Sequence, residues 1–260
     1  MDIVLLITGC ISPNRNQDYL VICDQKVRLQ QYVDSIIFYI KHSLFRNIVF
    51  CENSNFKYDD VSKLELLASQ YNKNFEWISF AGEASKISTF GKGYGEDEIV
   101  DYALENSLML AKCESFAKVT GRLILQNVDE MIKPCSLKEN YFLRDIYRHH
   151  TYAVDTRFYV VNKDFFCTNL RGCYKKDYSK AETQALEDVY FLLLRGRYKP
   201  FYHFYDFTGV SGGNGRDYSK MPMSMKWIIN LFIALRIYNC LFVLLFIYRR
   251  ALRKFLHIDF

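Results

Sequence analysis

Three cationic side chains stand where a ligand cleft could form. Lys92 lies between glycines in a short glycine-rich segment, Arg122 follows a Thr-Gly pair, and Arg157 closes an Asp-Thr-Arg triplet. A guanidinium binds phosphate oxygens in pairs, and glycine lets backbone N–H groups approach the same oxygens, here at Gly93 and Gly95. The types and spacing therefore predict a diphosphate site, with Lys92, Arg122 and Arg157 at its rim.

Carboxylates near these cations give a second kind of chemistry. Glu187 and Asp188 lie in an otherwise apolar helical segment, so a carboxylate there would face a cleft or solvent. In a cleft it could act as general base on an acceptor hydroxyl. Asp155 is a further catalytic candidate. Pairing of Asp155 with Arg157, two residues along one strand face, and a surface position for Lys92 are the plain alternatives.

The first eighty residues predict the elements that would position these groups. Buried strands alternate with helix-period segments, which is typical of a doubly wound parallel sheet. The strands are Asp2–Thr8, Asn47–Glu52 and Phe75–Phe80, and the helices fall at Leu29–Leu44 and Val61–Tyr71. Ligands of such sheets bind beyond the carboxyl ends of the strands. That rule places Thr8, Gly9, Glu52 and Asn53 at the cleft.

The second half predicts a different order of elements. A long helix opens at Glu96 and runs to about Phe116, because acids suit the positive first turn. It is followed by strands at Leu123–Leu125, Tyr152–Val161 and Phe201–Phe207, with a Leu-rich helix at Ala181–Arg195. Seven of the 12 glycines fall in 91–95 and 209–215, which indicates close backbone approach to a ligand and makes Ser211 a candidate contact.

Composition excludes several classes of protein. The chain has 260 residues, of which 50% are hydrophobic and 17% aromatic, so it is not disordered. Taking the six basic and one acidic residues of 221–260 from the totals of 34 and 29 leaves 28 of each. An electroneutral body argues against nucleic acid as a partner. Eight cysteines without a CxxC pair are expected to be reduced, and no signal peptide is evident.

The basic surplus lies beside an apolar run in the last forty residues. Trp227–Tyr248 is long enough to span a bilayer, but Arg236 lies in its middle. Four further basic residues follow it (Arg249, Arg250, Arg253 and Lys254). This pattern favours an amphipathic, membrane-associating helix lying in the plane of the membrane. A true span and a helix packed in a homo-oligomer are the alternatives.

The ordered set of segments resembles bacterial glycosyltransferases encoded in capsule and O-antigen clusters. The set comprises Asp2–Gly9, Asn47–Asn55, Lys92–Glu96, Thr120–Arg122, Asp155–Arg157, Leu186–Asp188 and Gly209–Gly212. The resemblance covers about residues 1–220 and implies a GT-A-like α/β fold, a Rossmann-type, mostly parallel sheet flanked by helices. It implies a nucleotide-diphosphate sugar donor, with a UDP-sugar favoured. It also implies that Glu52 and Asn53 contact the base or ribose, and that Glu187 or Asp188 supplies the catalytic base.

One departure from that family concerns the metal. GT-A enzymes typically bind Mg²⁺ or Mn²⁺ through an Asp-x-Asp after a central strand, and this sequence has none. Asp129 and Asp155 are the nearest substitutes. Lys92, Arg122 and Arg157 could instead neutralise the leaving diphosphate, so metal dependence and metal independence both stay open.

The sequence therefore predicts a catalytic domain at 1–220 and a basic, apolar membrane-association tail at 221–260. Within the domain, 1–90 would bind the nucleotide and 91–220 the donor phosphates and the acceptor. The expected activity is sugar transfer to a lipid-linked saccharide in surface-polysaccharide assembly. The protein would be cytoplasmic, peripheral or monotopic on the inner face of the bacterial plasma membrane. A nucleotidyl- or phosphotransferase and a non-catalytic, membrane-tethered binding module are the rival hypotheses.

Overall fold

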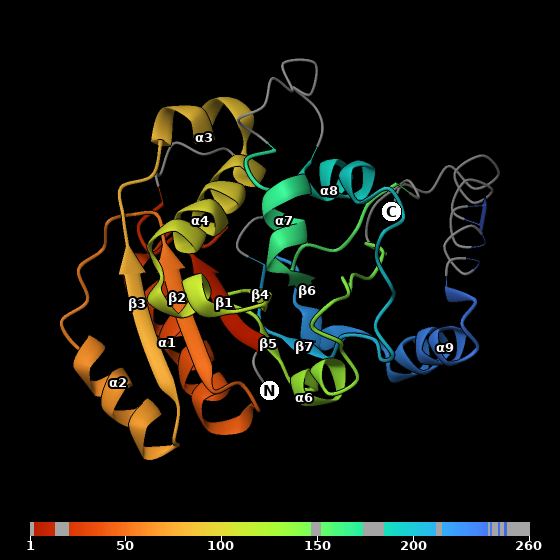
Figure 1. The fold of residues 1–260 in the computed structure, drawn as a ribbon, viewed down its shortest axis with the longest axis horizontal. Helices are drawn as coiled ribbons and strands as arrows, with labels where there is room; N and C mark the ends of the chain where they lie inside the picture. The colour runs from red at the N-terminus through yellow and green to blue at the C-terminus, as the bar shows by residue number, and fades with distance from the viewer. Residues whose placement is uncertain are drawn as a thin grey trace.

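A five-stranded sheet forms the centre of the molecule in the computed structural model (Figure 1). The structure describes residues 3–13, 21–146, 152–173, 185–211, 215–238, 240, 244 and 247–248. The strand order is β3-β2-β1-β4-β6, and a short pair, β5 and β7, forms a second sheet. Strands β1 to β4 are parallel, and β6 runs antiparallel to β4. Their bounds are β1 Ile3–Gly9, β2 Asn47–Glu52, β3 Asn74–Ser79, β4 Ser115–Thr120, β5 Ile124–Leu125, β6 Phe158–Asn162 and β7 Phe207–Thr208.

Strand β1 shows why the sequence forms this sheet. All seven of its residues are buried, as expected of a parallel strand covered on both faces. Successive side chains point to opposite faces, so Leu5 and Ile7 join one apolar cluster while Val4 and Leu6 join the other. The expected alternation of strands and helices in the first eighty residues is confirmed.

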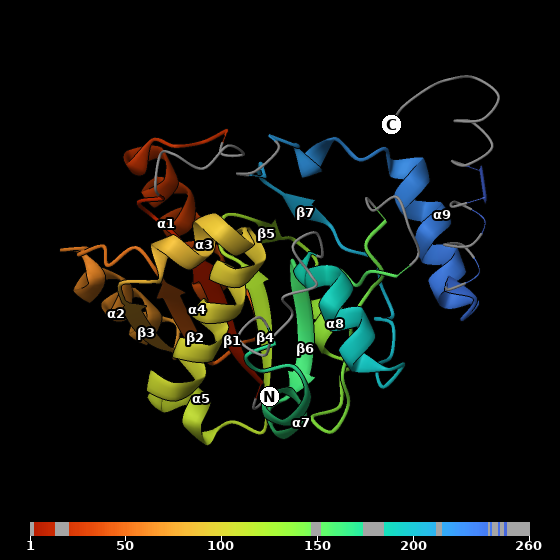
Figure 2. The same cartoon turned by 90° about the horizontal axis from the view of Figure 1, so that it is seen from above.

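Helices cover both faces of the sheet (Figure 2). The first cluster contains residues of α1 (Gln25–His42), α2 (Val61–Gln70), α6 (Val128–Ile132) and α9 (Met223–Ala234). The second contains residues of α4 (Lys92–Asn106), α5 (Leu108–Lys112), α7 (Lys163–Asn169) and α8 (Leu186–Leu194). Helix α3 (Ala84–Phe90) precedes α4, and a 3₁₀ turn, η1, covers Tyr218–Lys220. The result is a layered α/β fold, as the sequence predicts.

Helix α4 carries acidic residues that point into the protein. Asp97, Glu98 and Asp101 are all buried, and each accepts a hydrogen bond from a different part of the chain. Their donors are the Tyr190 hydroxyl for Asp97, the Asn53 side-chain amide for Glu98 and the Gly172 backbone N–H for Asp101. The α4 acids therefore fasten three segments to one helix, because a buried carboxylate requires such partners.

The long helix expected to run to Phe116 is wrong in its second half. Helix α4 ends at Asn106, and the Ser107 side chain begins α5 by accepting from the Leu110 N–H at 3.1 Å. Strand β4 then starts at Ser115 and lies between β1 and β6. The sequence hides this central strand because it contains a lysine, Lys118, which is completely buried.

Other expected elements are shorter than the patterns indicate. Within Tyr152–Val161 the strand begins at Phe158, and within Phe201–Phe207 the backbone is irregular up to β7. The Leu-rich helix begins at Leu186, and the earlier part of the expected Ala181–Arg195 segment lies outside the described residues. Phe201, Phe204 and Tyr205 pack in the core although their backbone lies outside a strand, so the high β propensity of this segment reflects burial.

The apolar tail does not form one continuous helix. Helix α9 ends at Ala234, and Arg236 takes a left-handed backbone conformation with φ 57°. Its inner face, at Ile229 and Ile233, packs in the core, and Phe204 N–H donates to Asn230 at 2.8 Å. Among the described residues, no helix combines the length and the apolar character that crossing a bilayer would require. Residues 249–260, with their four basic side chains, lie outside the described part.

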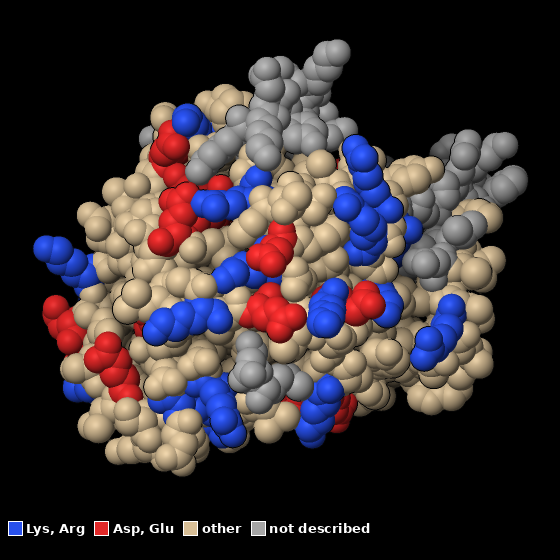
Figure 3. Space-filling model, in the orientation of Figure 1, with Lys and Arg blue, Asp and Glu red and all other residues tan. Residues whose placement is uncertain are grey.

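Charges of both signs are interspersed on the face of the molecule that Figure 3 shows. This distribution matches the equal numbers of basic and acidic residues counted in 1–220. The described part of this face therefore presents no continuous basic surface of the kind that tracks a nucleic-acid backbone.

Candidate functional site

Two of the three predicted cations share one electrostatic environment. Partial burial of the ammonium, and then the charges of Arg122 and Arg28, lower the pKa of Lys92, while Glu187 partly offsets the effect. Lys92, Arg122, Arg28 and Glu187 therefore lie near one another, at the carboxyl end of the parallel strands. The carboxylates of Glu52 and Glu98 also act at this edge of the sheet, on the Cys10 thiol, so an anionic ligand is favoured here by donors of Arg122 that lack partners in the described structure and not by net charge.

Lys92 is placed by the start of a helix and not by a glycine loop. Gly91 has φ 84° and precedes α4, whose first residue is Lys92, so Gly93 and Gly95 are helical. A Cβ on Gly95 would come within 3.2 Å of the Ile87 side chain, which indicates that this glycine serves packing. The expectation that Gly93 and Gly95 form a phosphate-binding loop is therefore wrong. Both glycines lie near the N-terminus of a helix, which itself favours negative charge.

Arg122 is held by a tight turn at the end of β4. Gly121 N–H donates to the Thr8 carbonyl at 2.9 Å, and a Cβ on Gly121 would come within 2.6 Å of that oxygen. The guanidinium carbon of Arg122 lies 5.9 Å from the centroid of the Tyr32 ring. Its Nε and Nη1 are buried and have no hydrogen-bond partner in the described structure. Buried donors of this kind carry a desolvation cost that a bound anion would relieve.

Arg28 is the cation that the sequence analysis missed. It is buried in the apolar face of α1, and its Nε and Nη1 donate to the carbonyls of Cys10 and Ile22 at 2.8 and 3.0 Å. These bonds hold the segment after β1 against the helix. No motif marks Arg28, and its position one turn before Tyr32 was the only available signal.

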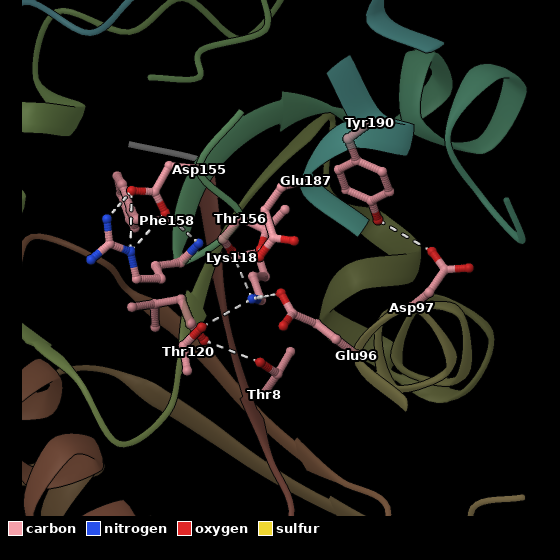
Figure 4. A network of polar contacts seen from close by, with 12 residues as sticks. Thr8, Glu96, Asp97, Lys118, Thr120, Asp155, Thr156, Phe158, Glu187 and Tyr190 are labelled. Carbon is pink, nitrogen blue, oxygen red and sulfur yellow. Dashed lines mark hydrogen bonds and ion pairs between the residues drawn. The ribbon is translucent and has the colours of Figure 1, made fainter. Parts of the chain in front are cut away.

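Glu187 is the carboxylate that faces this group of cations. It lies in the first turn of α8, and its Oε1 accepts from the Thr156 hydroxyl at 3.3 Å (Figure 4). Glu187 also raises the pKa of Lys92, so its charge reaches the side chain of this exposed lysine. Glu187 therefore lies close to Lys92, and the Thr156 hydroxyl holds its carboxylate. Asp188 follows it in the same first turn.

Asp155 and Arg157 pair with each other, which is the alternative to separate catalytic and diphosphate-binding roles for these two residues. Asp155 Oδ1 accepts from both the backbone N–H and the Nε of Arg157 at 2.9 Å, and Asp155 is almost fully buried. The guanidinium carbon of Arg157 lies 4.5 Å from the centroid of the Tyr218 ring. The structure therefore joins Arg157 to Asp155, while the cation that accompanies Lys92 and Arg122 is Arg28.

The carboxylate expected at the end of β2 holds the surrounding backbone and side chains in place. Glu52 is fully buried, and its carboxylate accepts from the N–H groups of Ile11, Ser54 and Phe56 and from the hydroxyls of Ser54 and Ser79. A carboxylate with five donors has no capacity left for a base or ribose, so that expectation is corrected.

At the same strand ends, Thr8 and Gly9 have structural roles, whereas Asn53 has a polar atom available for a ligand. The Thr8 hydroxyl donates to the Val119 carbonyl at 3.4 Å, and Gly9 leaves room for the Phe50 ring, which a Cβ would approach to 2.7 Å. Asn53 differs, because its buried Oδ1 has no hydrogen-bond partner among the described residues. Asn53 therefore keeps an unused acceptor that a ligand N–H or hydroxyl could fill.

The second glycine-rich segment also approaches Arg122. Gly209 follows β7 with φ 113°, and a Cβ there would come within 2.8 Å of the Arg122 carbonyl. Ser211, two residues later, donates its backbone N–H to the Arg216 carbonyl at 2.8 Å. The turn containing Ser211 thus starts beside Arg122, while residues 212–214 lie outside the described part.

The donor groups present do not fit a divalent cation. Asp129 lies in the first turn of α6, and its Oδ1 accepts from the Leu44 N–H at 2.8 Å. Asp155 is paired with Arg157, and the segment at the end of β4, Thr120-Gly-Arg122, contains no carboxylate. Within the described ranges, no three His, Cys, Asp or Glu side chains come together as metal ligands. The assignments of Asp129 and Asp155 to a metal are therefore corrected.

Comparison with solved structures identifies the fold. The chain is similar to the glycosyltransferase GlyE of Streptococcus pneumoniae TIGR4, with a TM-score of 0.52 and 9% identity over 76% of this chain. The apo form of GlyE gives a TM-score of 0.53, again with 9% identity, over 77%. The matches cover 44% and 45% of those longer chains. No family model and no curated protein matches the sequence. The α/β sheet is thus one found in a glycosyltransferase.

Proposed function

We propose that this protein transfers a sugar from a nucleoside-diphosphate donor to a saccharide acceptor. The observation that carries the proposal is Arg122, whose buried Nε and Nη1 lack partners beside Lys92 at the carboxyl end of the sheet. A diphosphate supplies the oxygens that these donors require. The similarity in fold to GlyE agrees with this reading, and the donor is most simply a UDP-sugar.

The proposed step uses three groups of the chain. The acceptor hydroxyl gives its proton to Glu187, and its oxygen forms a bond to the anomeric carbon. The bond from that carbon to the diphosphate oxygen breaks, and its electron pair leaves with the nucleoside diphosphate. Lys92 and Arg122 stabilise the charge that develops on this leaving group, as preorganised cations do in a cleft of low polarity. No step is assigned to a metal ion.

The acceptor is proposed to be lipid-linked, as in capsule or O-antigen assembly at the inner face of a bacterial membrane. The support is the outer face of α9, where apolar side chains at four-residue spacing are exposed (Met223, Trp227, Leu231 and Leu235). An exposed apolar stripe with a tryptophan suits the boundary between lipid headgroups and acyl chains. The basic residues that follow in the sequence would add attraction to anionic lipid.

A ligand screen with product analysis tests the proposed activity. UDP-sugars and UDP should raise the melting temperature, and turnover should release free UDP. Arg122→Met should weaken UDP binding about tenfold or more. The matched control is Arg46→Met, an exposed arginine at the amino end of β2, which should bind UDP like the wild type.

Three outcomes would contradict the proposal. Release of pyrophosphate in place of UDP would identify nucleotidyl transfer. Tight UDP-sugar binding without transfer or hydrolysis, unchanged by Glu187→Gln, would identify a binding module. Equal effects of the two arginine substitutions would show that Arg122 does not hold the diphosphate.

A further inference from the structure

A buried lysine lies in the middle of the central sheet. Lys118 belongs to β4, between β1 and β6, and its side chain is completely buried. A buried ammonium is costly unless it is paired and hydrogen-bonded. Lys118 forms an ion pair with Glu96 and donates to the Thr120 hydroxyl at 3.2 Å and to the Thr156 carbonyl at 2.8 Å. All three of its N–H donors are therefore used.

The three partners of Lys118 come from the segments that carry the site (Figure 4). Glu96 lies one helical turn after Lys92 on α4, and Thr120 lies two residues before Arg122. Thr156 holds Glu187 through its hydroxyl, at 3.3 Å. One ammonium thus links the elements that present the two cations and the carboxylate, although Lys118 itself is completely buried.

We infer that Lys118 is the positioning residue of the transfer reaction. It fixes Thr156, which orients Glu187 for proton removal, and it fixes the end of β4, from which Arg122 reaches the diphosphate. The inference rests on the proposed function and adds to it different positioning roles for Thr156 and Lys118. The Thr156 hydroxyl acts on the carboxylates of Glu187 and Glu96, whereas Lys118 serves both the base, through Thr156, and the diphosphate group, through the end of β4.

Electrostatics within the network agree with this arrangement. Burial raises the pKa of Glu96, Lys118 opposes that rise, and Glu187 adds to it. Glu96 and Glu187 therefore repel each other across the network, and the ammonium of Lys118 is the cation that keeps them close. Without it, Glu187 would be expected to move away from Thr156.

Two substitutions separate the two tasks. Thr156→Val removes the hydroxyl that reaches Glu187 and leaves the carbonyl that Lys118 binds. It should lower kcat about tenfold to a hundredfold, with the donor KM and the UDP affinity unchanged. Thr156→Ser restores the hydroxyl and should recover most of kcat. Lys118→Met should lower kcat and also weaken UDP binding, because it frees the end of β4.

Controls distinguish positioning from mere stability. Thr168→Val, on the exposed side of α7, should leave kcat unchanged. If Thr156→Val lowers only the melting temperature and the folded enzyme keeps the wild-type kcat, the inference is wrong while the proposed function stands. If the wild-type protein neither transfers nor hydrolyses any UDP-sugar although it binds UDP, both the proposed function and this inference fail.

Discussion

At the scale of single residues, the site separates into groups that face a ligand and groups that hold them. The charges of Arg122 and Glu187 both act on Lys92, and Arg122 has buried donors without partners in the described structure. Glu52 looks like a ligand contact in the sequence, yet five protein donors occupy its carboxylate. Residue type and strand position predict the edge of the sheet correctly. They do not reveal which side chain turns inward, because that depends on partners distant in the chain.

The ion pair between the buried Lys118 and the partly exposed Glu96 predicts a pH-dependent effect on stability. Lys118→Met removes the cation that opposes the raised pKa of Glu96, so that pKa should rise further above its ordinary value of 4.5. When the pKa of an acid is higher in the folded than in the unfolded protein, the protein loses stability as the pH rises from the unfolded-state pKa to the folded-state pKa. The deficit relative to wild type should therefore be small near pH 4.5 and reach about 3 kcal/mol at pH 8.

Urea unfolding of both proteins at several pH values measures this deficit. The double variant Lys118→Met/Glu96→Gln has no acid at this position and should show a deficit that does not change with pH. A deficit of equal size at pH 5 and pH 8 in the single variant would contradict the explanation.

At the scale of elements, the first half of the fold could be predicted from the sequence and β4 could not. Runs of apolar residues mark β1 and β2, since both faces of these strands are covered. Strand β4 contains Ser115, Lys118 and Thr120, which read as polar helix positions until Glu96 is seen to neutralise the lysine. The tail was equally misleading, because hydropathy does not register the left-handed residue, Arg236, that follows α9.

The close contact between the ends of β1 and β4 predicts the effect of one glycine substitution. A Cβ at Gly121 would lie 2.6 Å from the Thr8 carbonyl oxygen, which is backbone and has little freedom to move. Gly121→Ala should therefore shift the turn that carries Arg122, cost more than about 2 kcal/mol of stability and reduce UDP binding. Chemical unfolding and UDP titration measure the two effects.

Gly196→Ala is the comparison for this substitution. Gly196 has φ 74° after α8 with open space around it, so alanine there should cost only about 1 kcal/mol and leave UDP binding intact. Similar losses of binding in the two variants would argue against a special role for the β1–β4 contact.

At the scale of the whole molecule, α9 presents an apolar face at the surface. Its inner side chains pack in the core, Lys226 pairs with Asp206, and Trp227 is 66% exposed. An apolar stripe of this kind normally marks an interaction surface. The same helix therefore serves the core with one side and is proposed to meet lipid with the other.

Vesicle binding tests this face directly. The substitutions Trp227→Glu and Leu231→Glu together should weaken binding to phosphatidylcholine–phosphatidylglycerol vesicles at least tenfold, because they replace apolar contacts with charges of the wrong sign. Sedimentation with the vesicles measures the bound fraction. Leu66→Glu, at an exposed leucine of α2, should bind like the wild type. Undiminished binding of the double variant would show that α9 is not the lipid-facing surface.

The inward acids of α4 have a consequence for how this protein can evolve. Each of these acids interacts with a group elsewhere in the chain (Glu96, Asp97, Glu98 and Asp101). Replacing one of them alone would therefore leave its partner without an ion pair or hydrogen bond. In distant relatives we expect Glu96 to be inherited or replaced together with Lys118, and Asp97 together with Tyr190. Such correlated substitutions would identify relatives of this protein whose overall sequence identity is low.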